Sequence, residues 1–407
     1  HYRVPKGYDP EKRAGLTVIL HGSNLDRRWG FANHSDKTFR PDDIVVSPDG
    51  TTSNGRGGFN FLGEKKDAKR LKALLDELRE TFKINGVYLY GHSQGSFFAF
   101  YFAGEYPEDV NGIVGHASGV WNWTTQGKKG HHQAIVLMHG TQDPVVPYGQ
   151  SEGGYESFMK AKYPIVRLRS LEGWNHWPSE HNGGFHGVIP HTSQQMAWIE
   201  GMTTTDPERL AWCFEFLAEN KIRERHDYAG TYTLAKHVEA SEIASEKLKA
   251  HAAKVSTAIE ALATEHVKVL EEEMPDKKLA LEAKAWPGHV LMFLRSFNGV
   301  PACEAFFEAH GKELSKSRET GLKHFRAYWK GVNGDKPEKA FDAGLDAVES
   351  GFIYHQTGNF DFRKNMKAWR KDLKLGKKDQ KRFDAVFADF EKSQELGYKA
   401  FDKINKK

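Results

Sequence analysis

The stretch that decides the fold is Val87-Tyr88-Leu89-Tyr90-Gly91-His92-Ser93-Gln94-Gly95, which runs directly into a second apolar segment, residues 96–106. A short apolar run, a serine between two glycines and a longer apolar run are typical of a strand, a sharp turn and a helix. The turn is too tight for side chains at the two glycines, and it exposes the serine hydroxyl at the end of the strand. The pattern therefore predicts that Ser93 is a nucleophile that can attack a carbonyl carbon.

A nucleophilic serine needs a histidine to take its proton and a carboxylate to orient that histidine. Both residue types follow Ser93 in the chain, each just after an apolar run that predicts a strand. Asp143 follows residues 134–138, and His176 follows residues 165–171. Open α/β sheets place their chemistry in the loops after the strands. The sequence thus predicts a triad of Ser93, Asp143 and His176.

Other residues compete for the two supporting roles. His181, His186 and His191 lie in the same region as His176, and we interpret them as the rim of a glycine-rich loop. Their spacing of five residues differs from the i, i+4 spacing of a helical zinc pair. Asp109 is a poorer candidate for the acid than the residue after the 134–138 run, because no strand precedes it.

The turn His21-Gly22-Ser23-Asn24 follows another strand-like run, residues 16–20. We expect backbone N–H groups of Ser23 and of Gln94, the residue after the nucleophile, to form an oxyanion hole. His92 and His139, like the histidine of the turn itself, are interpreted as residues that pack and hydrogen-bond loops.

Several segments together resemble a known family. They are VPKGYDPEKRAGLTVILHGS (4–23), VVSPDG (45–50), VYLYGHSQGS (87–96), HGTQDPVVPY (139–148) and GWNHWP (173–178). They are similar to the polyhydroxybutyrate depolymerase and feruloyl esterase-like type of secreted α/β-hydrolase, over residues 1–220. The resemblance implies Ser93 as nucleophile, Asp143 as acid and His176 as base, with no metal or organic cofactor. It also implies a secreted or periplasmic protein whose signal peptide has been removed before His1.

The alternation of strand and helix patterns in residues 1–222 predicts a catalytic domain of the α/β class, with a mostly parallel sheet covered by helices. The predicted strands are 16–20, 44–47, 87–90, 112–116, 134–138 and 165–171, and the predicted helices are 64–81, 96–106, 154–162 and 207–220.

Residues 223–407 show helical periodicity and no strand pattern, so we expect an all-helical domain of unknown role. Its predicted helices are 234–273, 279–285, 301–310, 315–330, 337–350, 362–373 and 378–405, with breaks at 286–288, 298–299, 333–335 and 358–359. We assign its core to the aromatic residues Phe293, Phe297, Phe306, Phe307, Phe325, Tyr328 and Trp329. The domain is a candidate for self-association or for binding a substrate or partner. Cys213 and Cys303 fall in different predicted domains, which favours two unpaired thiols over a disulfide.

Composition excludes some classes of function. The formal net charge is +4, and basic residues are interspersed with acidic ones, so a nucleic-acid partner is not expected. Hydrophobic residues make up 39% of the chain without a run long enough to predict a membrane span.

The predicted substrate site is aromatic. Trp121, Trp123, Trp174 and Trp177 lie in the loops around the triad, where they either line a groove for an aryl or polymeric ester or simply pack the loops. We therefore predict a carboxylic ester hydrolase that forms an acyl-enzyme on a feruloyl-type or polyester substrate. Two alternatives stay open, a serine peptidase on the same scaffold and a binding protein with a relic triad.

Overall fold

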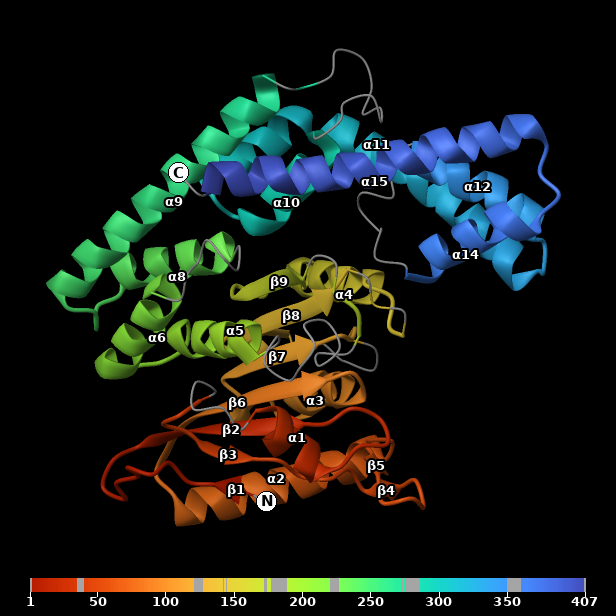
Figure 1. The fold of residues 1–407 in the computed structure, drawn as a ribbon. Helices are drawn as coiled ribbons and strands as arrows, with labels where there is room; N and C mark the ends of the chain where they lie inside the picture. Colours follow the sequence, from red (N-terminus) through yellow and green to blue (C-terminus); the bar gives the residue numbers. More distant parts are fainter. Residues whose placement is uncertain are drawn as a thin grey trace. The chain divides into compact units, whose positions relative to one another are not determined.

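A seven-stranded sheet organises the N-terminal half of the chain, in the strand order β1-β3-β2-β6-β7-β8-β9 (Figure 1). The edge strand β1 is antiparallel to β3, and every other neighbouring pair is parallel. The expected α/β class with a mostly parallel sheet is confirmed. The strands of this sheet are β1 (Tyr2–Arg3), β2 (Ala14–Leu20), β3 (Ile44–Val46), β6 (Ile84–His92), β7 (Gly112–His116), β8 (Ala134–Gly140) and β9 (Val166–Leu171), and β4 (Thr52–Ser53) pairs with β5 (Phe59–Asn60) in a separate ribbon.

The computed structural model describes residues 2–34, 40–120, 127–141, 143, 145–171, 174–176, 189–219, 227–272, 274, 286–349 and 360–405. The chain forms two units, one made of residues 1–220 with 234–252 and the other of residues 221–233 with 253–407. The boundary expected after residue 222 stays a prediction. No helix within the described ranges is long and apolar enough to cross a membrane.

Helices cover both faces of the sheet, and strand alternation decides which face each one takes. Ile113 and Gly115 of β7 point toward the face covered by α2, α3 and α4, where the ring of Phe100 lies against Gly115. Gly112 points to the opposite face, where Ile199 of α5 packs on it. The helices of this part are α1 (Arg27–Asn33), α2 (Glu64–Thr81), α3 (Gln94–Glu105), α4 (Gly149–Lys160), α5 (Ile189–Gly201) and α6 (Pro207–Glu219), with short 3-10 turns at Pro107–Asp109 and Gly127–Gly130.

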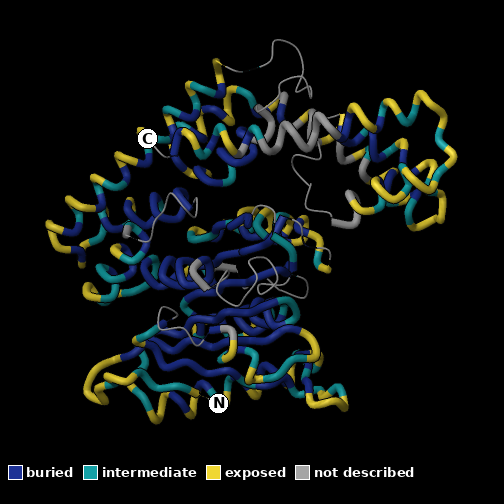
Figure 2. The backbone as a smooth tube through the Cα atoms, viewed as in Figure 1, coloured by how far each residue is buried: buried dark blue, intermediate teal, exposed yellow. Residues whose placement is uncertain are grey.

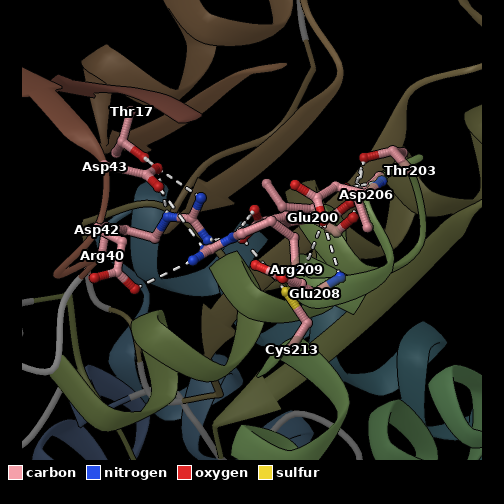
Figure 3. Close-up of polar contacts among 12 residues, drawn as sticks. Thr17, Arg40, Asp42, Asp43, Glu200, Thr203, Asp206, Glu208, Arg209 and Cys213 are labelled. Carbon is pink, nitrogen blue, oxygen red and sulfur yellow. Dashed lines mark hydrogen bonds and ion pairs between the residues drawn. The ribbon is translucent and has the colours of Figure 1, made fainter. Parts of the chain in front are cut away.

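A buried ion network holds α5 and α6 on their face of the sheet (Figure 3). Arg40, which is 1% exposed, donates to Asp43 from Nε at 2.7 Å and forms an ion pair with Glu200 of α5. Arg209 of α6 donates to both oxygens of Glu200 at 2.8 Å. The Cys213 thiol lies 3.4 Å from the same carboxylate. The two buried guanidinium groups face two buried carboxylates, so the positive and negative charges within the network cancel.

The C-terminal part is helical in all its described segments, as expected. Its helices are α8 (Tyr228–Ala240), α9 (Glu246–Glu272), α10 (Trp286–Ser296), α11 (Pro301–Asn333), α12 (Pro337–Glu349), α14 (Phe360–Asp372) and α15 (Lys377–Asn405). Three expectations are wrong here. The stretch expected as a helix at 234–273 is divided into α8 and α9, with residues 241–245 between them. Residues 286–288 begin α10 rather than break a helix, because proline is well tolerated in a first helical turn. Residues 301–333 form one helix rather than two. The helix expected at 279–285 and the break expected at 358–359 lie outside the described residues.

Aromatic side chains form much of this helical core, as predicted for Phe293, Phe297, Phe306 and Tyr328, which are at most 2% exposed. Phe307 is a correction, since it is 47% exposed. It follows Phe306 directly on α11, and adjacent helical positions point in directions about 100° apart. Figure 2 shows buried and exposed positions alternating in this way along the helices.

A pair of buried histidines joins three of these helices. His266 of α9 lies with Nδ1 2.8 Å from Nε2 of His289 on α10. Its Nε2 lies 2.9 Å from Oδ1 of Asn405 on α15. Burial, together with the neighbouring His266, lowers the pKa of His289 to about 3. His289 is therefore neutral in the folded state.

Candidate active site

Ser93 occupies the sharp turn between β6 and α3. Its φ of 53° and ψ of −121° are disfavoured for a residue with a side chain, and such strain is characteristic of a nucleophile held at a turn. A Cβ on Gly91 would lie 2.5 Å from the Gly95 carbonyl oxygen, and one on Gly95 would lie 2.3 Å from the Leu20 carbonyl oxygen. The Ser93 N–H donates to the His116 carbonyl of β7 at 2.9 Å. Gly91 thus lets the turn close on itself, and Gly95 lets it pack directly against the end of β2.

Asp143 lies in the loop after β8, where the sequence placed the acid. Its Oδ1 accepts hydrogen bonds from the N–H groups of Val145 and Val146, both at 2.8 Å. Its Oδ2 lies 2.7 Å from Nδ1 of His176 and 3.0 Å from Nε2 of His139. Burial alone would raise the pKa of Asp143, but the hydrogen bonds from the two histidines lower it well below its usual range. The carboxylate is therefore ionised and fixed by four donors.

His176 is 1% exposed and is held at two points. Its Nδ1 donates to Asp143, so the lone pair of a neutral ring is on Nε2, the nitrogen that a base uses in this arrangement. Its backbone carbonyl accepts a hydrogen bond from Nε2 of His92 at 3.0 Å, and the two imidazole rings lie 5.0 Å apart. Since His92 directly precedes Ser93, this bond ties the histidine loop to the nucleophile turn.

The turn after β2 lies against the nucleophile, as expected for an oxyanion hole. A Cβ on Gly22 would lie 3.5 Å from Cβ of Ser93, so the backbone next to Ser23 is close to the side chain of the nucleophile. Gln94 is the first residue of α3, and the first N–H groups of a helix have no partner within it. Its side-chain Oε1 accepts from the N–H of Phe61 at 3.0 Å, which fixes the residue.

A small hollow of about 100 Å³ adjoins Gln94. Phe61, Leu62, Phe97 and Tyr101 line it, and Leu62 is 61% exposed. Liquid water occupies about 30 Å³ per molecule, so this hollow has room for a short apolar group.

Of the four predicted substrate residues, the structure places one. Trp174 is half-buried beside His176, and its ring lies 5.0 Å from that of His191. Trp121, Trp123 and Trp177 lie outside the described residues.

Two rival assignments are also placed. His191 is not on a loop but on α5, where it is 9% exposed. Asp109 forms an ion pair with Arg79 at 2.5 Å. His181 and His186 are not described. Among the residues that the structure covers, no group of three or more His, Cys, Asp or Glu side chains could hold a metal ion.

His92 and His139 pack and hydrogen-bond loops, as predicted, and these are the loops of His176 and Asp143. Sequence reasoning did not show that both rings are buried against these two residues of the triad. Burial lowers the pKa of His92 to about 3, so this ring is neutral when it donates to the His176 carbonyl. The signal for His139 was present, since it precedes Asp143 by four residues at the end of the same strand.

Comparison with known proteins gives a family match for part of the chain. Residues 63–192 match the sequence profile of the Phospholipase/Carboxylesterase family. A search of curated protein sequences finds no match.

Solved structures similar to this chain include esterases. Esterase PE8 is 21% identical, with 48% of this chain and 97% of that chain covered and a TM-score of 0.38. A Bacillus cereus carboxylesterase is 18% identical, with 50% and 93% covered and a TM-score of 0.39. Est1E from Butyrivibrio proteoclasticus, solved with ferulic acid, is 15% identical, with 48% and 92% covered and a TM-score of 0.37.

The parallel sheet, the nucleophile turn after β6 and the order of serine, acid and histidine along the chain define an α/β-hydrolase. Within that class, the match over residues 63–192 makes it esterase-like, and the protein is a carboxylic ester hydrolase.

Proposed function

We propose that this protein is a serine esterase that forms an acyl-enzyme on Ser93. The observation that carries the proposal is the 2.7 Å hydrogen bond between His176 Nδ1 and Asp143. The backbone carbonyl of the same histidine is bonded to His92, the residue before Ser93. The bond to Asp143 fixes the tautomer of His176 whose Nε2 can take a proton.

The proposed reaction has two stages. His176 takes the Ser93 hydroxyl proton as Oγ attacks the ester carbonyl, and the resulting oxyanion is bound by N–H groups of Gln94 and the Ser23 turn. The C–O bond to the alcohol then breaks, and the alcohol leaves with the proton from His176. In the second stage a water molecule gives its proton to His176 and attacks the acyl-enzyme, which releases the acid and restores Ser93.

For the substrate, we propose an ester with a short or aryl acyl group, including feruloyl and polyester types. The hollow beside Gln94 and the half-buried Trp174 support this preference, because Gln94 directly follows the nucleophile and Trp174 precedes the base by two residues, and both sites offer apolar surface. The secreted or periplasmic location implied by the resemblance is likewise a proposal.

The test of the mechanism is Ser93→Ala, with Ser157→Ala as the matched control. Ser157 is an exposed serine on α4 whose hydroxyl bonds to the Gly153 carbonyl. We expect Ser93→Ala to lower kcat on a chromogenic short-chain ester by about 10⁴-fold or more and to abolish labelling by a fluorophosphonate probe. The control should keep both. Activity of Ser93→Ala equal to that of the unaltered protein would contradict the proposal.

A substrate panel on the full chain tests specificity. Acetyl, butyryl, feruloyl and polyester substrates are compared with peptide amides, and an esterase should be nearly inactive on the amides. Faster cleavage of amides than of matched esters would instead favour a serine peptidase.

A further inference from the structure

His139 is a buried histidine of the candidate site that the proposed reaction does not use. It lies at the end of β8 and is 0% exposed. Its Nε2 lies 3.0 Å from Oδ2 of Asp143 and 2.9 Å from the Val146 carbonyl oxygen. Its Nδ1 lies 2.7 Å from Oγ of Ser151 on α4. Both ring nitrogens are thus within hydrogen-bonding distance of oxygen.

Counting donors shows how many protons this ring carries. Nε2 faces a carboxylate oxygen and a carbonyl oxygen, which only accept, so Nε2 must carry a proton. Ser151 has a single hydroxyl proton, and its Oγ lies 2.5 Å from the Ser118 carbonyl oxygen, which also only accepts. Ser151 therefore donates to Ser118, and the Nδ1 contact forms a hydrogen bond only if Nδ1 donates to Ser151. Two protons on one ring make His139 an imidazolium.

The surroundings of His139 balance this charge. Asp143 supplies a carboxylate in direct contact, and a buried cation is tolerated when it is paired and hydrogen-bonded. The other titratable groups near the ring are His116 on β7, His176, which shares Oδ2 of Asp143, and Tyr148, whose ring lies 5.8 Å away. The hydroxyl of Tyr148 is engaged with Ser170 of β9 at 2.5 Å.

We propose that His139 is a positioning residue, held as a buried imidazolium that shares Oδ2 of Asp143 with His176. It donates to the same carboxylate oxygen as the base, and its charge opposes protonation of His176. A second proton on His176 would therefore lie beside a positive charge that is held on the same carboxylate oxygen. The inference rests on the proposed function, in which His176 is the base.

The activity test is the pH profile of kcat/KM for His139→Gln, which keeps a donor toward Asp143 and removes the charge. Without the nearby cation His176 binds a proton more readily, so the acidic limb should move to higher pH by about one unit. We expect kcat to fall by about tenfold with KM little changed. Ser151→Ala removes the acceptor of the Nδ1 proton and should move the limb in the same direction by less. Ser157→Ala on the same helix should leave it in place.

A limb that does not move in His139→Gln, whether or not kcat falls, overturns the inference while leaving the serine mechanism intact. For a variant that does not fold, Ser151→Ala supplies the decisive profile, since a small buried hydroxyl is replaced with little loss of volume.

A second measurement needs no activity. In ¹⁵N-histidine-labelled full-length protein, with His139→Gln used to assign the signal, both ring nitrogens of His139 should carry a proton at the pH of the activity assay. A neutral His139 ring under those conditions refutes the inference even if ester hydrolysis is confirmed. If the protein hydrolyses no ester at all, the proposed function fails, and this measurement still decides the protonation of His139.

Discussion

Replacing Glu200 with glutamine removes one charge from the buried network on α5 while keeping the volume of the side chain. Two guanidinium groups, Arg40 and Arg209, are then left with one buried carboxylate, Asp43. Burial alone would raise the pKa of Glu200, but the charges of Arg40 and Arg209 lower it below its ordinary value, so the carboxyl is ionised in the fold. The substitution therefore leaves an uncompensated positive charge inside the protein.

The size of the effect follows from this burial. Arg40 and Glu200 are each 1% exposed on the side chain and are in direct contact. Removing one partner of such a pair costs about 3–5 kcal/mol, because the remaining charge is still deprived of water. With an m-value of about 3 kcal/mol/M, the urea midpoint of the N-terminal unit should fall by about 1 M or more.

Urea unfolding of the full chain, followed by far-UV circular dichroism and by tryptophan fluorescence, measures this loss. Trp198 and Trp212 are suited as probes, because Arg209 lies 4.6 Å above the ring of Trp212 and Trp198 is on α5. Asp42→Asn is the matched control, since Asp42 also pairs with Arg209 but its side chain is 61% exposed. Exposed ion pairs contribute about 1 kcal/mol or less, so the control should barely shift the midpoint.

A double-mutant cycle sharpens the result. Arg40→Met combined with Glu200→Gln leaves Asp43 and Arg209 as one carboxylate and one guanidinium, so the network again has no net charge. The free energy of unfolding lost by the double variant should therefore be smaller than the sum of the two single losses by about 1–3 kcal/mol. A Glu200→Gln loss within about 1 kcal/mol, or strict additivity in the cycle, would refute the view that these charges are mutually dependent.

Two further predictions concern the nucleophile turn and the helical unit. Gly95→Ala should lower the rate of ester hydrolysis at least about a hundredfold, since the added Cβ would meet the Leu20 carbonyl oxygen at 2.3 Å. Gly153→Ala is the control and should keep the rate, because the space around Gly153 is open. Equal kinetics for the two variants would contradict the packing argument. The pKa of His289 is lowered to about 3 in the fold, so unfolding takes up a proton below about pH 6.5, and stability should fall by about 2 kcal/mol as the pH drops from 6.5 to about 4.5. His289→Gln should reduce the pH slope of urea stability in that range, and an unchanged slope would count against a neutral His289.

Strong periodic patterns in the sequence predicted the elements that carry the site. The strands that lead into Ser93 and Asp143 were expected at nearly their observed positions, because consecutive apolar residues bounded by glycine are typical of buried parallel strands. The helix 64–81 was expected at its observed bounds, since its apolar residues repeat at helical spacing.

Other elements carried no local signal. Helix α5 was missed because Thr192, Ser193, Gln194 and Gln195 are buried in it, so no apolar stripe contrasts with a polar face. Helix α11 was divided in the prediction, although Gly311 continues the helix. The spacing of four residues pointed to a contact between His139 and Asp143, but the sequence did not show that His176 shares the same carboxylate oxygen, because that depends on tertiary placement.

The buried network of Figure 3 also bears on the order in which the fold can assemble. Arg40 pairs with Asp43 three residues away, and Arg209 pairs with Glu200 nine residues away, whereas Arg40 and Glu200 are separated by 160 positions. Each short-range pair is neutral by itself. The loop before β3 and the α5–α6 hairpin can therefore each form with their charges already matched, and docking one on the other brings no unpaired ion into the apolar face. Assembly in this order avoids the desolvation cost that a single buried arginine would impose on every earlier intermediate.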